Sequence, residues 1–154
     1  MRYNARWLAN YTYSQVSRLG AFALPSILKT FVNKVKSGGA WDLKRLKSWQ
    51  PGRGNYYVYR GKKLKNDDPG NIHFGYVGSV LFPVNVLCAG AGLYQIKSGT
   101  SKWRYFFSFF DDPRDSSMIR LGNRRYYADK LYSITQLINS ALQKIRKRGY
   151  RWYI

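Results

Sequence analysis

The chain has 154 residues and a formal net charge of +20, with 27 Lys and Arg residues against 7 acidic residues. With 45% hydrophobic residues it can bury one core, so we expect a single globular unit in which residues 1–30 pack on residues 31–154. One His and one Cys exclude a zinc site built on a His pair or a Cys cluster, and the charge favours polyanionic partners such as RNA, anionic lipid or wall polymers.

The first half of the chain predicts helices followed by a loop. From residue 15 to residue 36 apolar residues recur with the helical period, in a helix that Pro25 bends or divides and that the SGG sequence at 37–39 ends. A short helix with a basic outer face is predicted over residues 41–49. Residues 50–70 hold four glycines and two prolines around the strand-like YYVY, so they predict a long loop with at most a small hairpin.

The second half predicts three more helices. The apolar run over residues 77–97 is rich in small residues and is expected to start near Pro83. In the sequence DDPRD, Asp112 is the expected N-cap, Pro113 the first helical residue, and Asp115 an anion favoured by the helix dipole. A last helix with one apolar stripe covers residues 133–148. The predicted fold class is mainly α, with about five helices and at most a small hairpin in one domain.

Two features bear on the location of the protein, and a third concerns its one cysteine. The N-terminal sequence MRYNARWLANYTYSQ lacks the apolar core and the cleavage site of a secretory signal, so we expect synthesis in the cytoplasm and release by another route. No uninterrupted apolar run has the length of a membrane span. Cys88 lies in the apolar sequence VLFPVNVLCAGAG and is predicted to be a buried thiol rather than a reactive one.

Two polar constellations have the residue types for catalysis. The first lies in DDPGNIHFGYVGS, where glycines such as Gly75 would let a ligand approach the backbone, and contains Asp67, Asp68, Asn71, His73 and Tyr76. The second lies in DDPRD and contains Asp111, Asp112, Arg114 and Asp115. If the fold brings them together, carboxylates and the one imidazole face each other in a pocket, an arrangement that separates acid and base roles.

Each of these residues also has a purely structural interpretation. Asp112 suits a helix cap, and Asp115 suits the positive end of the helix dipole. His73 stands between Ile72 and Phe74, as a histidine of the core would. The spacing of the nearby glycines is also compatible with a tight turn. The residues alone leave both interpretations open.

Four ordered blocks carry a resemblance to a known family. The blocks are FVNKVKSGGAWDLKR, DPGNIHFGYVGSVLF, LCAGAGLYQIKSGTS and FDDPRDSSMIRLGNRRYY. Together they span about residues 31–127 and resemble the polymorphic toxin type 44 domain. The resemblance implies an antibacterial effector, with an immunity protein that protects the producing cell. The small free-standing format also resembles a colicin-type bacteriocin, which would carry its uptake signal in residues 1–30 or in the basic tail RKRGYRWYI.

The resemblance also selects site residues. By their positions in the blocks these are Asp42, Asp68, Asn71, His73, Gly75, Asp111, Asp112 and Asp115. Phe74 replaces the tyrosine that is usual in the family, so a catalytic tyrosine there is excluded and Tyr76 remains. The predicted catalytic residues are His73, Asp68, Asp111, Asp112 and Asp115. The predicted substrate-binding residues are Asp42, Asn71, Gly75, Tyr76 and Arg114, and we expect neither a metal nor another cofactor.

Three functions follow from these residues and the resemblance. In the first, the protein passes an outer-membrane receptor and uptake machinery and hydrolyses peptidoglycan in the periplasm with Asp and His as acid and base. In the second, it is a ribonuclease with His73 as base, and RNA is its partner. In the third, the basic helix 133–148 damages membranes. The first is favoured because a wall substrate spares a small toxin the crossing of a second membrane.

Overall fold

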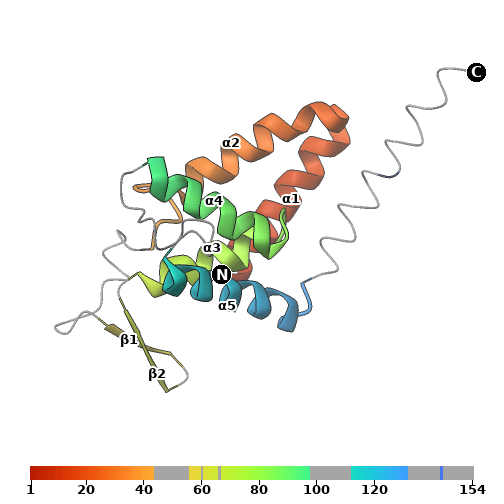
Figure 1. The fold of residues 1–154 in the computed structure, drawn as a ribbon. Helices are drawn as coiled ribbons and strands as arrows, with labels where there is room; N and C mark the ends of the chain where they lie inside the picture. The colour runs from red at the N-terminus through yellow and green to blue at the C-terminus, as the bar shows by residue number, and fades with distance from the viewer. Residues whose placement is uncertain (44–55, 60, 66, 98–111, 132–142, 144–154) are drawn as a thin grey trace, which may run out of the picture.

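The structure is a computed structural model, and it describes residues 1–43, 56–59, 61–65, 67–97, 112–131 and 143 (Figure 1). Its helices are α1 (Arg2–Leu19), α2 (Leu24–Val35), α3 (Asp68–Gly78), α4 (Val84–Lys97) and α5 (Pro113–Ala128), and the 3-10 turn η1 (Gly20–Ala23) joins the first two. An antiparallel hairpin pairs β1 (Tyr56–Tyr59) with β2 (Lys62–Lys65). The predicted class, mainly α with a small hairpin, is confirmed.

The helices α1 and α2 form a helical hairpin that reverses at η1 (Figure 1). Gly20 has a φ of 59°, a left-handed conformation that side chains rarely adopt, and this glycine allows the reversal. The predicted helix over residues 15–36 is therefore divided, but at residues 20–23 rather than at Pro25. Pro25 lies instead in the first turn of α2, where its missing N–H costs no hydrogen bond. The first helix also begins much earlier than predicted, at Arg2.

The helices α3 and α5 cross at two glycines. A Cβ on Gly75 would lie 2.0 Å from the backbone oxygen of Ile119, and a Cβ on Gly122 would lie 2.0 Å from that of Ile72. The two backbones are therefore in direct contact, which any larger residue would prevent. Gly75 therefore lies in a helix rather than in a tight turn. We expected this glycine to let a ligand approach the backbone, but the backbone of α5 occupies that position.

The main core lies where these crossing helices meet α1, α2 and α4. Its members share near-complete burial and include Leu8, Phe31, Tyr76, Leu87, Ile119 and Tyr126. Cys88 on α4 is fully buried within it, which confirms that this side chain is buried as predicted. The buried residues of α1, such as Leu8, thus share one core with the helices that carry the polar constellations.

Local signals placed two helix starts correctly. The helix α4 begins at Val84, directly after Pro83, and α5 begins at Pro113 behind its N-cap Asp112. The predicted helix over 41–49 is not helical at its described residues 41–43, of which 41 and 43 are turn residues, and the rest of it lies outside the described residues. The predicted helix 133–148 also lies outside them, apart from residue 143. Among the helices described, none combines the length and the hydropathy that a membrane span requires.

Candidate functional site

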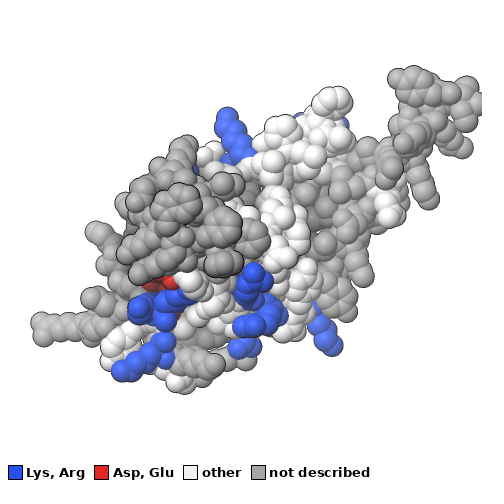
Figure 2. Space-filling view, in the orientation of Figure 1, with Lys and Arg blue, Asp and Glu red and all other residues white. Residues whose placement is uncertain are grey.

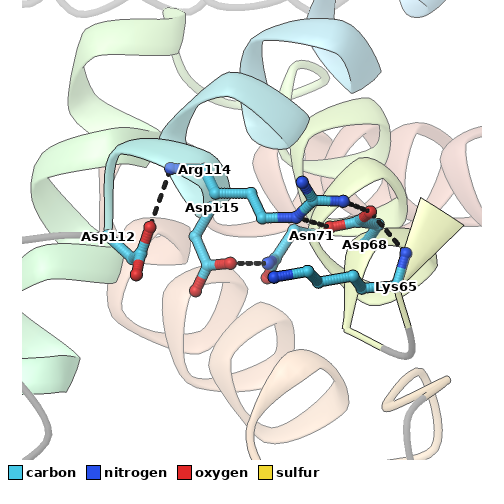
Figure 3. A network of polar contacts seen from close by, with 6 residues as sticks. All are labelled: Lys65, Asp68, Asn71, Asp112, Arg114 and Asp115. Atoms are coloured by element: carbon cyan, nitrogen blue, oxygen red, sulfur yellow. Dashed lines mark hydrogen bonds and ion pairs between the residues drawn. The ribbon is translucent and has the colours of Figure 1, made fainter. Parts of the chain in front are cut away.

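The two polar constellations meet where the N-terminal ends of α3 and α5 lie side by side (Figure 3). Each helix starts with an aspartate followed by a proline: Asp68 and Pro69 in α3, Asp112 and Pro113 in α5. Because the helices cross at their glycines, the first turns face each other. The spatial relationship on which the candidate site depends is therefore present between residues more than forty positions apart in the sequence.

Asp68 and Arg114 form the inner part of this cluster. The Nε of Arg114 donates to Oδ1 of Asp68 at 3.0 Å, and Nη2 donates to Oδ2 at 2.5 Å. The backbone N–H of Lys65 donates to Oδ2 at 2.7 Å and ties the β2 strand to α3. Asp68 is only 1% exposed, so its charge requires these donors. The hydrogen bond to Asp68 also raises the pKa of Arg114 above its ordinary value.

Asn71, Asp112 and Asp115 form the outer part. The Nδ2 of Asn71 donates to Oδ1 of Asp115 at 2.7 Å, which joins the two helices one turn further along. The Oδ1 of Asp112 accepts from the backbone N–H of Arg114 at 2.8 Å, so the predicted N-cap is confirmed. Both aspartates are partly exposed, and in Figure 3 their carboxylates extend to the same side of α5.

His73 is in another place. It follows Asn71 by two positions, which on a helix turns its side chain by about 200° away from the α5 side. Its Nε2 lies 3.0 Å from Nδ2 of Asn4 on α1, and its ring stands perpendicular to that of Trp41, with centroids 6.0 Å apart. Because an amide nitrogen can only donate, Nε2 is the acceptor and the ring is neutral.

The electrostatics of this position agree with a neutral ring. His73 is buried, and burial lowers its pKa to about 4, with a smaller effect from the positively charged N-terminus. The structure therefore brings together Asp68, Asn71, Arg114, Asp112 and Asp115, and it places the imidazole in the core instead of among them.

Tyr76 belongs to a third polar cluster. Its hydroxyl donates to Oδ2 of Asp129 at 2.6 Å, and Arg2 donates to both carboxylate oxygens of Asp129, at 2.9 Å from Nε and 2.7 Å from Nη2. The hydrogen bonds from Arg2 and then Tyr76 lower the pKa of Asp129, whereas burial, followed by the bond to Asp129, raises the pKa of Tyr76. This cluster fastens the start of α1 to the end of α5.

Two other predicted site residues remain. Oδ2 of Asp42 accepts from the backbone N–H of Gly38 at 2.9 Å and closes the turn after α2. Asp111 lies outside the described residues. Within the described part of the chain, no group of three or more His, Cys, Asp or Glu side chains is placed to hold a metal ion.

Sequence reasoning did not mark several of the contacting residues, among them Lys65, Asn4 and Arg2. Lys65 contributes its backbone N–H to Asp68, and its alternating strand KKLK was a signal that the strand-like YYVY had a pairing partner. Asn4 and Arg2 lie in the first turns of α1, far in the sequence from His73 and Asp129. No motif marked either of them.

The chain matches the model of a known protein family. A family model described as bacterial toxin 44 matches residues 30–129, a range that includes α3, α4 and α5. This range nearly coincides with the four blocks at about residues 31–127, and it confirms the resemblance seen in them. No curated protein and no solved structure matches the chain. The resemblance to colicin-type bacteriocins stays a prediction.

Proposed function

Because the chain belongs to the bacterial toxin 44 family, we propose that it kills competing bacteria as an enzyme that hydrolyses peptidoglycan. Its family makes it a bacterial toxin. The wall substrate and the hydrolytic reaction are our proposal, and both rest on the cluster at the start of α3 and α5.

The observation that carries this proposal is the pair of carboxylates at the start of α5, on its N-cap and in its first turn. Asp112 and Asp115 are partly exposed, extend to the same side, and are held by a backbone N–H and by Asn71 (Figure 3). Hydrolysis of a glycosidic bond generally requires two carboxyl groups, one to donate a proton and one to act as base or nucleophile. The pair supplies both groups from one rigid helical turn.

We assign the proton acceptor to Asp115. The N–H of Asn71 and the positive end of α5 both favour its charged form. Asp112 is the proposed acid, as the second carboxyl group that this reaction requires. A water then loses its proton to Asp115 and its oxygen joins the anomeric carbon. Asp112 gives its proton to the leaving oxygen as the glycosidic bond breaks.

The inner residues have a positioning role in this mechanism. Asp68 is buried and fixes Arg114, and Arg114 follows the cap residue Asp112 by two positions. Arg114 remains 40% exposed, and the side chain of Lys65 extends along Asn71 and Asp115 (Figure 3). These two cations are the proposed binding groups for the acidic peptide stems of the wall.

A ribonuclease is the second candidate, because the same two cations would suit a phosphodiester. Its proposed base is His73, which is buried, accepts a hydrogen bond from Asn4, and has a pKa lowered to about 4. A base in that position is poorly placed to reach a polymer, so the structure favours carboxylate chemistry over histidine chemistry. The third candidate, membrane damage by residues 133–148, concerns residues that lie outside those described, apart from residue 143.

The proposal has consequences for partners and location. A toxin domain of this family suggests an immunity protein in the producing cell. We further propose that the protein acts in the periplasm of the target cell, after passage through an outer-membrane receptor and its uptake machinery. RNA would be a partner only for the ribonuclease.

The decisive experiment incubates the purified protein with isolated sacculi and, separately, with total RNA. Release of soluble muropeptides with intact RNA is expected, and mass spectrometry of the products identifies the bond. Asp115→Asn keeps the oxygen that accepts from Asn71, so we expect it to fold normally and to release muropeptides at least ~100-fold more slowly. Asp112→Asn, which retains capping ability, should show the same loss.

Asp67→Asn is the matched control, because Asp67 is exposed and its side chain does not cap α3. It should release muropeptides at the parent rate. Degraded RNA with intact sacculi would overturn the proposal, and so would full wall activity in both Asp112→Asn and Asp115→Asn.

A further inference from the structure

The α1–α2 hairpin carries exposed apolar residues at its η1 turn and along one side of α2, and no part of the described structure covers them. We call this surface the apolar tip and define it by Leu19, Phe22, Leu24, Leu28 and Val32. All five are among the exposed large hydrophobic residues, and Phe22 in the η1 turn is 89% exposed. Leu24, Leu28 and Val32 follow one another at four-residue intervals along one side of α2.

This surface is more than the usual scatter of exposed apolar residues. The buried face of α2 consists of Ile27 and Phe31, and the exposed residues extend the apolar arc of the helix beyond it. In Figure 2 the described residues at the top of the molecule, where Figure 1 places the α1–α2 turn, are mainly neither basic nor acidic. Four of the five residues of the apolar tip precede the family match, which starts at residue 30, and only Val32 lies within it. Most of the tip therefore lies outside the matched domain.

The charge around the apolar tip is of one sign. Residues 1–41 contain six Lys and Arg residues and no acidic residue. Arg18 and Lys29 are exposed beside the tip, at the end of α1 and in the middle of α2. An apolar stripe flanked by cations is the pattern of helices that lie in the interface of an anionic bilayer.

We propose that the apolar tip docks on an anionic phospholipid bilayer, with Phe22 and its neighbours among the acyl chains and with Arg18 and Lys29 at the headgroups. A convex hairpin end suits a planar membrane surface (Figure 1). A second copy is a poor occupant, because each copy carries a net charge of +20.

This docking is independent of the reaction at α3 and α5. It would hold the protein at a membrane surface, so that it searches two dimensions instead of three. It requires neither a membrane span nor damage to the bilayer.

The test measures binding of the full chain to lipid vesicles by sedimentation. Vesicles that contain phosphatidylglycerol should bind the protein, whereas vesicles of phosphatidylcholine alone should bind it weakly, and salt should reduce binding. Phe22→Ser and Leu24→Ser should each weaken binding about tenfold. The matched control is Val86→Ser on α4. It also removes an exposed apolar side chain, but one that lies outside the tip, so this variant should bind like the parent.

A fluorescent label locates the contact. Phe22→Cys combined with Cys88→Ser carries an environment-sensitive dye at the tip, and its emission should shift to the blue only when anionic vesicles are added. Ser117→Cys with the same Cys88→Ser change places the dye on the exposed side of α5, where no shift is expected. If Cys88→Ser impairs folding, the binding series above decides alone.

Three results would overturn the proposal. One is equal binding of the parent and both tip variants. Another is a blue emission at position 22 without vesicles, because it would mean that a second copy or another part of the chain covers the tip. The third is equal binding to both kinds of vesicle.

Discussion

Arg114 on α5 donates two hydrogen bonds to Asp68 on α3, and the two ends of this ion pair have different surroundings. The carboxylate is 1% exposed and the guanidinium side chain 40%. The pair therefore joins a buried charge to a partly solvated one, and the buried charge depends on its partner far more than the reverse.

Replacement of Arg114 by alanine should reduce the free energy of unfolding by roughly 3 kcal/mol, because it leaves the Asp68 carboxylate buried without its counter-charge. Chemical denaturation measures this loss. Arg120→Ala, an exposed change on the same helix, should stay within about 0.5 kcal/mol of the parent. Adding Asp68→Asn to Arg114→Ala should recover part of the loss, and the absence of any recovery would contradict this account of the pair.

The close crossing of α3 and α5 predicts that even a methyl side chain at its two glycines strongly reduces the stability of the protein. Gly75→Ala and Gly122→Ala place a methyl group 2.0 Å from a backbone oxygen of the facing helix, so each should cost more than about 2 kcal/mol of stability. Gly90→Ala provides the comparison: it is also helical, but a Cβ there meets nothing within 4 Å. That variant should be stabilised by about 0.5–1 kcal/mol. Similar stability of all three variants would show that the helices do not cross as described.

The buried imidazole predicts a dependence of stability on pH. His73 has a pKa of about 4 in the folded chain and about 6.5 when exposed, so below pH 6.5 the unfolded chain binds a proton that the folded chain does not. Protonation of His73 therefore does not affect the free energy of unfolding above pH 6.5. As the pH falls below 6.5 the free energy of unfolding decreases, and at pH 4 the loss is about 3 kcal/mol.

Nuclear magnetic resonance can check this directly, because the chain has one histidine and its ring signals are unambiguous. The signals should titrate near pH 4. A midpoint near 6.5 would place the imidazole in solvent and would reopen its assignment as a catalytic base.

The hydroxyl of Tyr76 should contribute measurably to stability. Tyr76→Phe removes its hydrogen bond to the charged Asp129 and should cost about 1.5–3 kcal/mol in thermal or chemical unfolding. Tyr127→Phe removes a hydroxyl from a tyrosine that is 47% exposed, and it should change stability by less than about 0.5 kcal/mol. Equal effects of the two substitutions would contradict a special role for the buried hydroxyl.

Local chemistry accounts for what could be predicted from the sequence. The start of α5 depends on a cap and a proline that are adjacent in the chain, and the start of α4 depends on Pro83. By contrast, α3 contains three glycines and a proline, so its helical conformation depends on packing against α5 that no local pattern reveals. The early start of α1 was missed because its buried side chains include small and polar residues such as Ala5, Ala9 and Thr12.

The candidate site shows the same division. That Asp68 and Asn71 meet Arg114 and Asp115 was a prediction about two motifs, and it agrees with the contacts. The sequence could not predict that His73 points to Asn4, because a histidine beside apolar residues is compatible with both a core and a catalytic site. Only the direction of its side chain on α3 distinguishes them, and that direction depends on the register of helix packing.

The bonds of Arg2 to Asp129 and of Asn4 to His73 have a consequence for protein engineering. They mean that α1, which precedes the matched residues, contributes side chains to the core of the toxin domain. A chimera that transplants residues 30–129 alone would leave Tyr76 and its core neighbours without the packing that α1 provides. Modules exchanged between toxins at this family boundary should therefore carry the first helix with them.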